Sequence, residues 1–358
     1  MHISLPHGDV RLPAFFPDGT YGSVKCLDKH DLHASGVRGL VMNTFHLLTR
    51  PGVGTLRAIG GLHALSNWDR PILTDSGGFQ AFSLIRENPQ NGEIRNNEIL
   101  FRNEVGERIS LSPEKCIQAQ MTYGSDIVMC LDVCTHPDDD YATTLRSVEL
   151  TIKWAKVCKE QFETLVKQKK FTGAKRPKLF GIIQGGADKQ LRKQCAQELI
   201  ALGLDGFGYG GWPLDGEGNL TGDILEYTAN LMPDDLPKYA MGMGRPEEIV
   251  ALYRMGYTLF DCVIPTREAR HHRLYVFDDG PLNEANKGFY QYFYYLDDTH
   301  ARDTRPVDAS CDCHLCQNYS RAYLRHLAKA GDPLALRLAS MHNVRFYTRL
   351  MERLQDGC

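Results

Sequence analysis

The sequence lacks a long apolar run, and no stretch approaches the roughly 20 residues that a membrane-spanning helix requires. Its first residues, MHISLPHGDVRLP, contain no apolar segment of the signal-peptide type. An excess of positive charge is also missing, since 41 Lys and Arg against 44 Asp and Glu give a net charge of −3. These absences argue against a membrane protein and against a generally basic nucleic-acid binder, although a local basic patch stays compatible with them. We expect a cytoplasmic protein.

Repeats and phosphate-binding glycine loops are absent as well. The chain shows no internal repeat at a solenoid period, and no GxGxxG motif opens a helix after a strand. What is present is ordinary for a globular protein, with 42% hydrophobic and 24% charged residues. A length of 358 residues is enough for one barrel or for two domains.

Short apolar segments that end in a polar or glycine tip recur along the chain, and most are separated by stretches with helical periodicity. The predicted strands are Ala14–Gly19, Arg38–Asn43, Pro71–Asp75, Asp126–Asp132, Leu179–Gln184, Gly206–Gly210, Lys238–Gly242 and Thr258–Val263. The clearest predicted helices are Ser112–Tyr123, Tyr141–Leu165, Lys189–Leu202 and Pro246–Met255. Eight alternations predict an α/β protein with a (β/α)8 TIM barrel, and the alternative is a doubly wound open sheet.

Cysteine is frequent, and its distribution indicates a metal. Three of the eleven cysteines lie together in the run CDCHLC at positions 311–316. An odd number of cysteines with one tight cluster favours metal binding over a disulfide framework. Three thiolates, from Cys311, Cys313 and Cys316, and one imidazole form a closed tetrahedral zinc site of the structural type. Spacing alone does not decide whether the fourth ligand is His342, His314 or His326.

Two segments interrupt the alternation. Residues 85–111 are polar, and we expect Glu98–Phe101 to pair with Glu107–Leu111 in a hairpin that lies as a flap over the barrel mouth. From Leu274 the pattern becomes irregular and leads through an aromatic run to the cysteines. We therefore predict a catalytic barrel at residues 1–297, with the insertion at about 85–111, and a zinc-binding subdomain with terminal helices at residues 298–358.

The stretch PILTDSGGFQAFSL, at positions 71–84, has the features of a site for a flat polar ring. Asp75 ends a short buried strand, a glycine turn lets the backbone approach a ligand, and Phe79 offers an aromatic face. Other predicted strand tips carry Asp132, Gln184, Gly210, Gly211, Met241 and Asp261.

In a barrel these tips meet on one face, where active residues gather. One aspartate can act as a nucleophile and another can move protons. Asp132 and Gln184 suit the polar edge of a purine-like ring, and Phe79 and Met241 suit its two faces.

Seven motifs, in order along the chain, resemble those of the tRNA-guanine transglycosylase (queuine tRNA-ribosyltransferase) family, most closely its bacterial form. They are TDSGGFQ at 74–80, SPEK at 112–115, GSDIVM at 124–129, FGIIQGG at 180–186, MGMGRPE at 241–247, LFDCVIPTREAR at 259–270, and CxCxxC followed by His342. The resemblance extends from about Pro13 to Met351.

The resemblance implies a (β/α)8 barrel with a zinc subdomain that exchanges guanine in tRNA, at the anticodon wobble position, for a 7-deazaguanine base in queuosine biosynthesis. Asp261 matches the nucleophile, which forms a covalent ribosyl intermediate, and Asp75 matches the general acid/base. The base-binding positions match Ser76, Phe79, Asp132, Gln184, Gly211 and Met241. The zinc ligands match Cys311, Cys313, Cys316 and His342. The resemblance also implies a homodimer in which one subunit catalyses and the other helps to hold tRNA.

The chain departs from the family beside the base. Where the bacterial family has GGLAVGE, this sequence has GGWPLDGE at 210–217, and where the family has FDECT it has LDVCT at 131–135. Val133, Trp212 and Asp215 thus stand in the expected pocket for the 7-substituent. Losing a carboxylate disfavours a cationic aminomethyl group. We therefore expect a shift from 7-aminomethyl-7-deazaguanine toward the 7-cyano base or queuine.

The polymer is the second open question. Arg267, Arg270 and Arg273 closely follow Asp261, so we expect them to line the rim of the pocket and to contact phosphates. Two alternatives to tRNA-guanine transglycosylation stay open, namely a DNA 7-deazaguanine transglycosylase and a catalytically silent RNA-binding homologue. Keeping both Asp75 and Asp261 speaks against the silent homologue.

Overall fold

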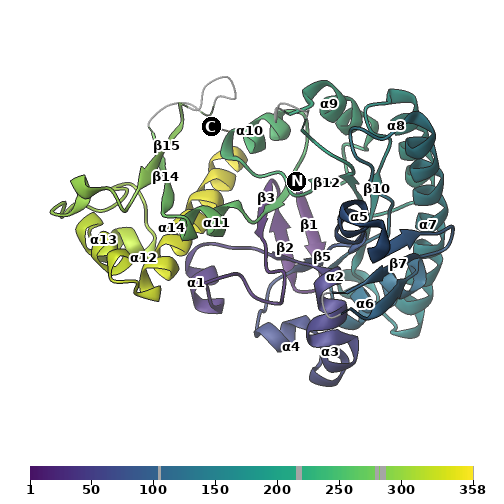
Figure 1. The fold of residues 1–358 in the computed structure, drawn as a ribbon, viewed down its shortest axis with the longest axis horizontal. Coiled ribbons are helices and arrows are strands. Elements are labelled where there is room, and N and C mark those ends of the chain that lie inside the picture. Colours follow the sequence, from purple (N-terminus) through teal and green to yellow (C-terminus); the bar gives the residue numbers. More distant parts are fainter. Residues whose placement is uncertain (104–105, 215–219, 279–281, 283–287, 358) are drawn as a thin grey trace.

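The computed structural model of the chain describes residues 1–358 except 104–105, 215–219, 279–281, 283–287 and 358. Its centre is a parallel sheet of eight strands in the order β3-β13-β12-β11-β10-β9-β5-β4 (Figure 1). The two outer strands meet as well, since Asp18 bridges Val41 of β4 and the Gly19 N–H donates to the Val41 carbonyl at 2.7 Å. The predicted (β/α)8 barrel is therefore confirmed, and the open doubly wound sheet is excluded.

The barrel strands fall within the predicted segments, apart from one residue at the start of β10. They are β3 (Ala14–Pro17), β4 (Leu40–Met42), β5 (Ile72–Thr74), β9 (Ile127–Met129), β10 (Lys178–Ile183), β11 (Gly206–Tyr209), β12 (Lys238–Ala240) and β13 (Leu259–Cys262). The helices are α1 (Lys29–Ala34), α2 (Thr44–Leu47), α3 (Val53–Ile59), α4 (Leu62–Ser66), α5 (Gly78–Glu87), α6 (Pro113–Tyr123), α7 (Tyr141–Gln168), α8 (Lys189–Ala201), α9 (Gly222–Leu231), α10 (Pro246–Arg254), α11 (Ile264–Arg270), α12 (His314–Asn318), α13 (Arg321–Lys329) and α14 (Pro333–Gln355).

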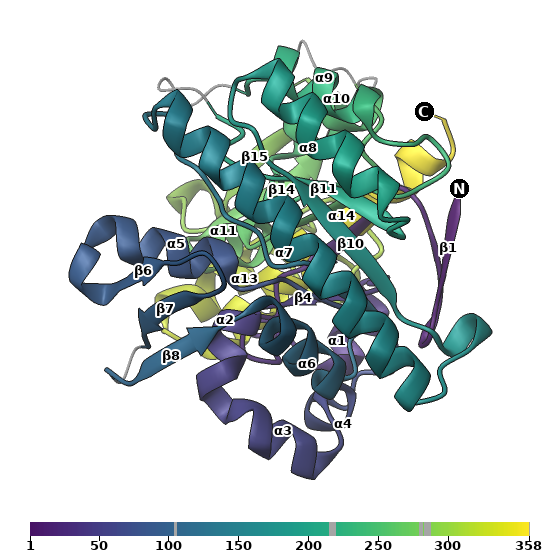
Figure 2. The same ribbon diagram turned by 90° about the vertical axis from the view of Figure 1, so that its right-hand side faces the viewer.

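Helix starts follow the expected chemistry of the sequence. The Ser112 hydroxyl accepts the Lys115 N–H, and Pro113 occupies the first turn of α6, where its missing N–H costs nothing. Asp140 caps the 28-residue α7 in the same way by accepting the Thr143 N–H. Figure 2 shows α7 crossing the outer surface of the barrel, with α6 and α8 on either side of it.

Alternation along the strands separates the inside of the barrel from the outside. In β3, Ala14 and Phe16 join an interior cluster with Leu73, Met129 and other strand residues, whereas Phe15 packs outward against Tyr347 of α14. Because side chains alternate along a strand, a residue two positions after an interior residue also points to the interior. Side chains just beyond the carboxyl ends of the strands therefore face a common mouth.

Several elements lie outside this barrel pattern. An N-terminal hairpin, β1 (His2–Leu5) and β2 (Gly8–Arg11), adds its apolar residues to the interior cluster. A second hairpin, β14 (Arg273–Phe277) and β15 (Tyr290–Tyr294), contains most of the aromatic run and packs with α11 and α14. The sequence predicted neither hairpin. The division of the chain at residue 297 stays a prediction.

The insertion forms a three-stranded antiparallel sheet of β6 (Gly92–Ile94), β7 (Ile99–Arg102) and β8 (Arg108–Leu111). Phe101 lies opposite Ile109, in the expected pairing, and Phe101 stacks on Phe45 with ring centroids 4.8 Å apart. The expected position over the mouth stays a prediction. None of the described residues that line the central cavity belongs to this sheet, but Arg102 of β7 lines an adjoining pocket with Phe79 and Gln80. Figure 2 shows the sheet next to α5.

Within the part of the chain that the structure describes, no helix combines the length and apolar character that crossing a membrane would need.

Candidate active site and metal centre

A cavity of about 400 Å³ opens at the carboxyl end of the barrel. The residues predicted at the strand tips meet there: its lining includes Asp75, Ser76, Phe79, Asp132, Gln184, Gly211, Trp212, Met241 and Asp261. Three of them, Asp75, Asp132 and Asp261, are called the mouth aspartates below. A cavity of this size and lining suits a single heterocyclic base.

Asp75 is held by the neighbouring strand tip. Its carboxylate accepts hydrogen bonds from Asn43 Nδ2 at 2.6 Å, from the Thr44 N–H at 2.8 Å and from the Gly77 N–H at 3.1 Å. Burial, together with the nearby charge of Asp261, raises the pKa of Asp75 to about 7, against the hydrogen bond from the Thr44 N–H. Asp75 can therefore gain or lose a proton near neutral pH.

Asp261 extends from the end of β13. The Tyr239 hydroxyl and the Gly242 N–H both donate to its Oδ1 at 2.7 Å. Burial raises the pKa of Asp261 to about 6, although these two hydrogen bonds oppose the effect. The carboxylate is thus mostly ionised at neutral pH, and both donors fix one oxygen while the other stays available to a reacting atom.

Asp132 and Gln184 form the polar wall of the cavity. Gln184 Nε2 donates to Asp132 Oδ2 at 2.7 Å, and the Ser76 hydroxyl donates to Oδ1 at 3.2 Å. Burial raises the pKa of Asp132 to about 6, against these two bonds. Gln184 Oε1 is buried and has no partner among the described residues. This wall therefore offers a carboxylate and a free amide oxygen to the N–H groups of a ligand.

Glycine is required where β11 ends. A Cβ at Gly210 would lie 2.5 Å from Gln184 Nε2, and Gly211 has a φ of 97°, a conformation that favours glycine. The next residue, Trp212, is 40% exposed and lies near Phe79, with ring centroids 5.9 Å apart. The turn thus brings a backbone edge and an indole to the same side of the cavity.

Trp212, Tyr209 and Leu214 also line a second cavity of about 450 Å³, which adjoins the first. Val133, predicted in the 7-substituent pocket, is buried in the core and is absent from the described lining of either cavity. Asp215, also predicted there, lies outside the described residues. Trp212 is therefore the member of this predicted trio that the structure places beside the base cavity.

The arginines that the sequence analysis singled out lie near the strand of Asp261, and further arginines lie around the metal centre. Arg267 and Arg270 lie on α11, which directly follows the strand that carries Asp261, and Arg273 begins β14. Arg273 pairs with Glu268 and covers the ring of Tyr292. The arginines around the metal centre are engaged by aspartates, as in the pairs Arg321–Asp303, Arg325–Asp298, Arg337–Asp31, Arg345–Asp312 and Arg349–Asp308.

The metal ligands converge as predicted. Ligand atoms of Cys311, Cys313, Cys316 and His342 all lie within 4.8 Å of one another and are buried. His342 Nδ1 is 3.5 Å from Cys313 Sγ and 3.3 Å from Cys316 Sγ, close to the S···N separation of about 3.6 Å in a tetrahedral zinc site. His342 Nε2 lies 2.7 Å from the Tyr275 carbonyl, which fixes its proton there and leaves Nδ1 for a metal. This donor set fits zinc.

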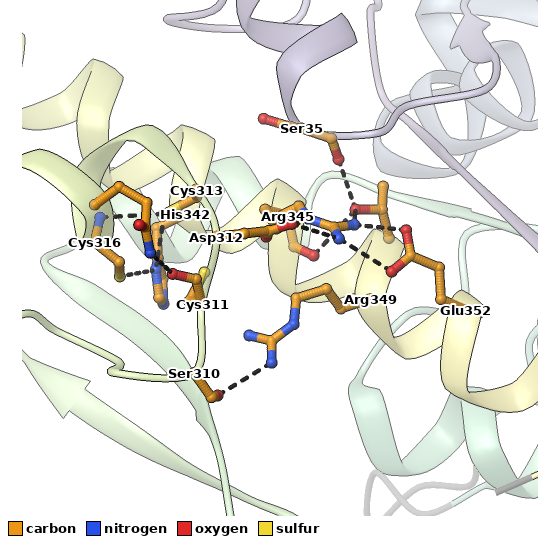
Figure 3. Close-up of polar contacts among 12 residues, drawn as sticks. Ser35, Ser310, Cys311, Asp312, Cys313, Cys316, His342, Arg345, Arg349 and Glu352 are labelled. Atoms are coloured by element: carbon orange, nitrogen blue, oxygen red, sulfur yellow. Dashed lines mark hydrogen bonds and ion pairs between the residues drawn. The ribbon is translucent and has the colours of Figure 1, made fainter.

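An ion-pair network connects the metal loop to α14 and the barrel (Figure 3). Arg345 donates to Asp312, which lies between two of the cysteines, at 2.7 Å. It also donates at 2.7 Å to Glu352, seven residues further along α14. Arg345 Nη1 also donates to the Thr348 hydroxyl, which donates to the Ser35 carbonyl at 2.6 Å. The metal loop is thereby tied to the barrel.

Fold and site together define a TIM-barrel protein with paired carboxylates around a base-sized cavity and a separate Cys3His centre. Comparison with known proteins identifies its family. The family model described as "Queuine tRNA-ribosyltransferase" matches residues 1–357. A queuine tRNA-ribosyltransferase of Mannheimia succiniciproducens is 42% identical over 99% of this chain and 88% of its own length. Relatives of the same name from Halothermothrix orenii (40%, 99% and 88%) and Actinobacillus succinogenes (42%, 100% and 89%) are similarly close.

The chain belongs to the queuine tRNA-ribosyltransferase family. This confirms the predicted family and the predicted enzyme class, a transferase of the tRNA-guanine transglycosylase type.

Proposed function

We propose that this enzyme replaces a guanine of tRNA, at the anticodon wobble position, with a 7-deazaguanine base in queuosine biosynthesis. The observation that carries the proposal is the meeting of Asp75 and Asp261 in one base-sized cavity, with neutral hydrogen-bond donors around both. The names of the relatives support tRNA as the polymer. A cytoplasmic location and a homodimer that helps to hold tRNA stay predictions.

The reaction uses Asp261 as the nucleophile. Its carboxylate oxygen forms a bond to ribose C1′ while the bond from C1′ to guanine N9 breaks, and the positive charge that develops at C1′ is stabilised by the carboxylate. Asp75, in its protonated form, gives its proton to the departing guanine. The resulting carboxylate takes a proton from the N9–H of the incoming base, which then attacks C1′ and releases Asp261. The pKa of Asp75 of about 7 suits both transfers.

Base recognition falls to the polar wall. Asp132 would accept the N–H groups that guanine and 7-deazaguanines share, and the unpartnered Gln184 Oε1 would accept a further donor. Gly211 offers its backbone, Ser76 holds Asp132, and Phe79 and Met241 enclose the ring. To reach this wall the target nucleotide must leave its stack. Arg267, Arg270 and Arg273 would contact its phosphates.

We further propose that the incoming base carries a neutral or bulky 7-substituent, as in the 7-cyano base or queuine, rather than aminomethyl. Trp212, Pro213 and Leu214 make one side of the cavity apolar, and the adjoining second cavity gives room beyond Trp212. The carboxylates among the described residues that line this second cavity are already engaged, Asp139 by Arg86 at 2.6 Å and Asp188 by the N-terminus of α8.

The test is radiolabelled guanine exchange into total tRNA and, in parallel, into duplex DNA, followed by competition among the three bases. We expect label in tRNA, with queuine or the cyano base competing best. Label in DNA alone would move the enzyme to the DNA-modifying branch. Tightest binding of the aminomethyl base would contradict the proposed base preference.

The covalent step has its own test. Asp261→Asn should lower exchange by at least about 10³-fold and abolish the protein–RNA adduct on denaturing gels. Tyr239→Phe, which removes one donor to the same carboxylate, is the matched control and should keep the adduct. An adduct that persists in Asp261→Asn would exclude Asp261 as the nucleophile.

A further inference from the structure

A fourth carboxylate, Asp18, stands at the end of a barrel strand and has no part in the chemistry described so far. It follows β3 directly, and β3 pairs with β13 so that Phe16 lies beside Asp261. Because Ala14 and Phe16 point into the barrel, the alternation of the strand directs Asp18 to the same side, above Phe16. The bridge between Asp18 and Val41 keeps this position extended.

Asp18 thus lies between the two strand tips that carry the reacting carboxylates. On one side is the strand of Asp261, and on the other is β4, whose next residue, Asn43, binds Asp75. The charge of Asp18 helps to raise the pKa of both Asp75 and Asp261, which places it within electrostatic reach of each. Asp18 is half-buried, and it follows the strand that pairs with β13, which carries Asp261.

One oxygen of this carboxylate is held and the other is available. The Thr20 hydroxyl donates to Asp18 Oδ1 at 2.6 Å, which fixes the rotation of the side chain. No described residue donates to Oδ2. An oriented carboxylate oxygen without a donor, at the edge of a nucleoside site, is an acceptor for a ligand hydroxyl.

The stereochemistry of the proposed reaction specifies which hydroxyl. The base of a nucleoside occupies one face of the ribose, and a nucleophile that displaces it must approach C1′ from the opposite face. That opposite face carries the 2′-hydroxyl, on the carbon next to C1′. A carboxylate beside Asp261 therefore meets the 2′-hydroxyl when Asp261 meets C1′.

We propose that Asp18 accepts a hydrogen bond from the 2′-hydroxyl of the target nucleotide and thereby makes the enzyme selective for RNA over DNA. The inference rests on the proposed function, since it takes Asp261 as the nucleophile. A 2′-hydroxyl is the group by which a protein distinguishes RNA from DNA at a given position. A 2′-deoxy nucleotide would leave Asp18 without this partner, and hydrogen bonds to charged groups are worth enough for roughly a tenfold to hundredfold preference.

The experiment compares two synthetic anticodon stem-loops that differ only at the exchanged position, which carries guanosine in one and 2′-deoxyguanosine in the other. Single-turnover guanine exchange is measured with the full-length zinc-loaded wild type, Asp18→Ala, Asp18→Asn and Asp138→Asn. Asp138 is an exposed carboxylate of the loop after β9, so its variant controls for the loss of one negative charge near RNA.

Wild type and Asp138→Asn should both prefer the ribose substrate by about tenfold or more. Asp18→Ala should lose most of that preference through a slower reaction with the ribose substrate alone. Asp18→Asn, which keeps an oxygen acceptor, should retain part of it. An unchanged preference in Asp18→Ala, or an equal loss with both substrates, would overturn the inference. No wild-type exchange with the all-ribose stem-loop would instead refute the proposed function, and the inference with it.

Discussion

Buried aspartates lie at both ends of the barrel, and their surroundings differ. At the carboxyl end, the mouth aspartates accept hydrogen bonds from neutral donors in the described part of the chain, and burial raises the pKa of each. At the amino end, Asp126 lies 2.9 Å from His7 Nδ1 and 3.4 Å from His63 Nε2. Burial raises the pKa of Asp126 too, but the hydrogen bonds from His63 and His7 outweigh it and lower the pKa.

The difference separates carboxylates whose charge can change near neutral pH from one that stays ionised. Neutral donors orient the mouth aspartates but stabilise their ionised form less than a charged partner would. The carboxyl groups can therefore gain or lose a proton near neutral pH. Two imidazoles stacked 3.6 Å apart, together with the His7 and Ile72 N–H groups, keep Asp126 ionised. There the charge has a structural role, because it attaches the N-terminal hairpin to the barrel.

Among the variants that test this comparison, the largest effect is expected from Asp75→Asn, which removes the predicted proton-carrying group from the mouth and keeps its shape. Guanine exchange should fall by about 10²- to 10⁴-fold, the usual contribution of a general acid/base. Near-normal exchange in radiolabelled guanine assays would remove the proton-transfer role of Asp75. Asp138→Asn, at an exposed carboxylate, should leave exchange nearly unchanged.

The same variant should change how stability depends on pH. A carboxyl whose folded pKa is raised stabilises the fold below its unfolded pKa, near 3.8, and this contribution is lost as pH rises through about 7. Between pH 4 and pH 8 the loss amounts to roughly 4 kcal/mol in the wild type. Chemical denaturation should therefore show Asp75→Asn gaining stability relative to the wild type as pH rises, and a constant difference would contradict this.

The metal centre sharpens the comparison, because there a divalent cation would compensate the buried negative charge. Cys313→Ser removes one thiolate, so bound zinc measured by plasma mass spectrometry should fall from one equivalent per chain to nearly none. Thermal unfolding of the C-terminal region should shift down by several degrees. Cys26→Ser, at an exposed cysteine, is the control. One full zinc equivalent in Cys313→Ser would refute the site.

The smallest effect is expected at the amino end, from His7→Ala. The hydrogen bond to Asp126 raises the pKa of His7 above its ordinary value of 6.5. Its stabilisation is therefore fully present below pH 6.5 and is lost as pH rises through the folded pKa, and it also falls at acid pH when Asp126 is protonated. The side chain of His7 is 39% exposed, so we expect about 0.5 kcal/mol or less near pH 5 to 6.

The contribution of His7 to stability is measured by chemical denaturation of His7→Ala across pH 5 to 8. The control is His2→Ala, at an exposed histidine of the same hairpin. A loss of stability that grows above pH 7 would contradict the assigned pairing. Exchange activity should stay at the wild-type level in both variants, because the hairpin lies at the end of the barrel opposite the cavity.

The barrel was predictable because its strands are buried on both faces and therefore appear as short apolar runs, each ending at a polar tip. The strands that sequence reasoning missed are short and only partly buried. β1 and β2 have four residues each, and β6 has three, so their alternation is too brief to stand out from a loop. The hairpin of β14 and β15 was missed because 12 residues of sequence, 278–289, separate its strands, where a hairpin signal needs a short turn.

The residues of the candidate site also fall into two groups, those that local sequence predicts and those that only the fold brings together. Strand tips gave Asp75, Asp132 and Asp261, since position after an apolar run is a local property. The groups that orient them were not found, because Asn43 and Tyr239 reach the aspartates only after the barrel closes, across 32 and 22 residues of sequence. A Tyr inside a predicted strand also fits an ordinary core residue. Asn43 and Asp18 stand at predicted strand tips, which is the signal that could have identified them.

Helix α14 has a consequence for the order of events during synthesis. It carries the last of the predicted metal ligands, His342, 26 residues after Cys316. It also fastens the beginning of the chain, through Arg337 to Asp31 and through Gln355 to the Pro13 carbonyl. A nascent chain therefore has its first barrel strand in place long before the helix that covers it has been made. The barrel is therefore completed only when α14 has left the ribosome, and a chain terminated before α14 would present Phe15 and the unmetallated thiols to the quality-control machinery.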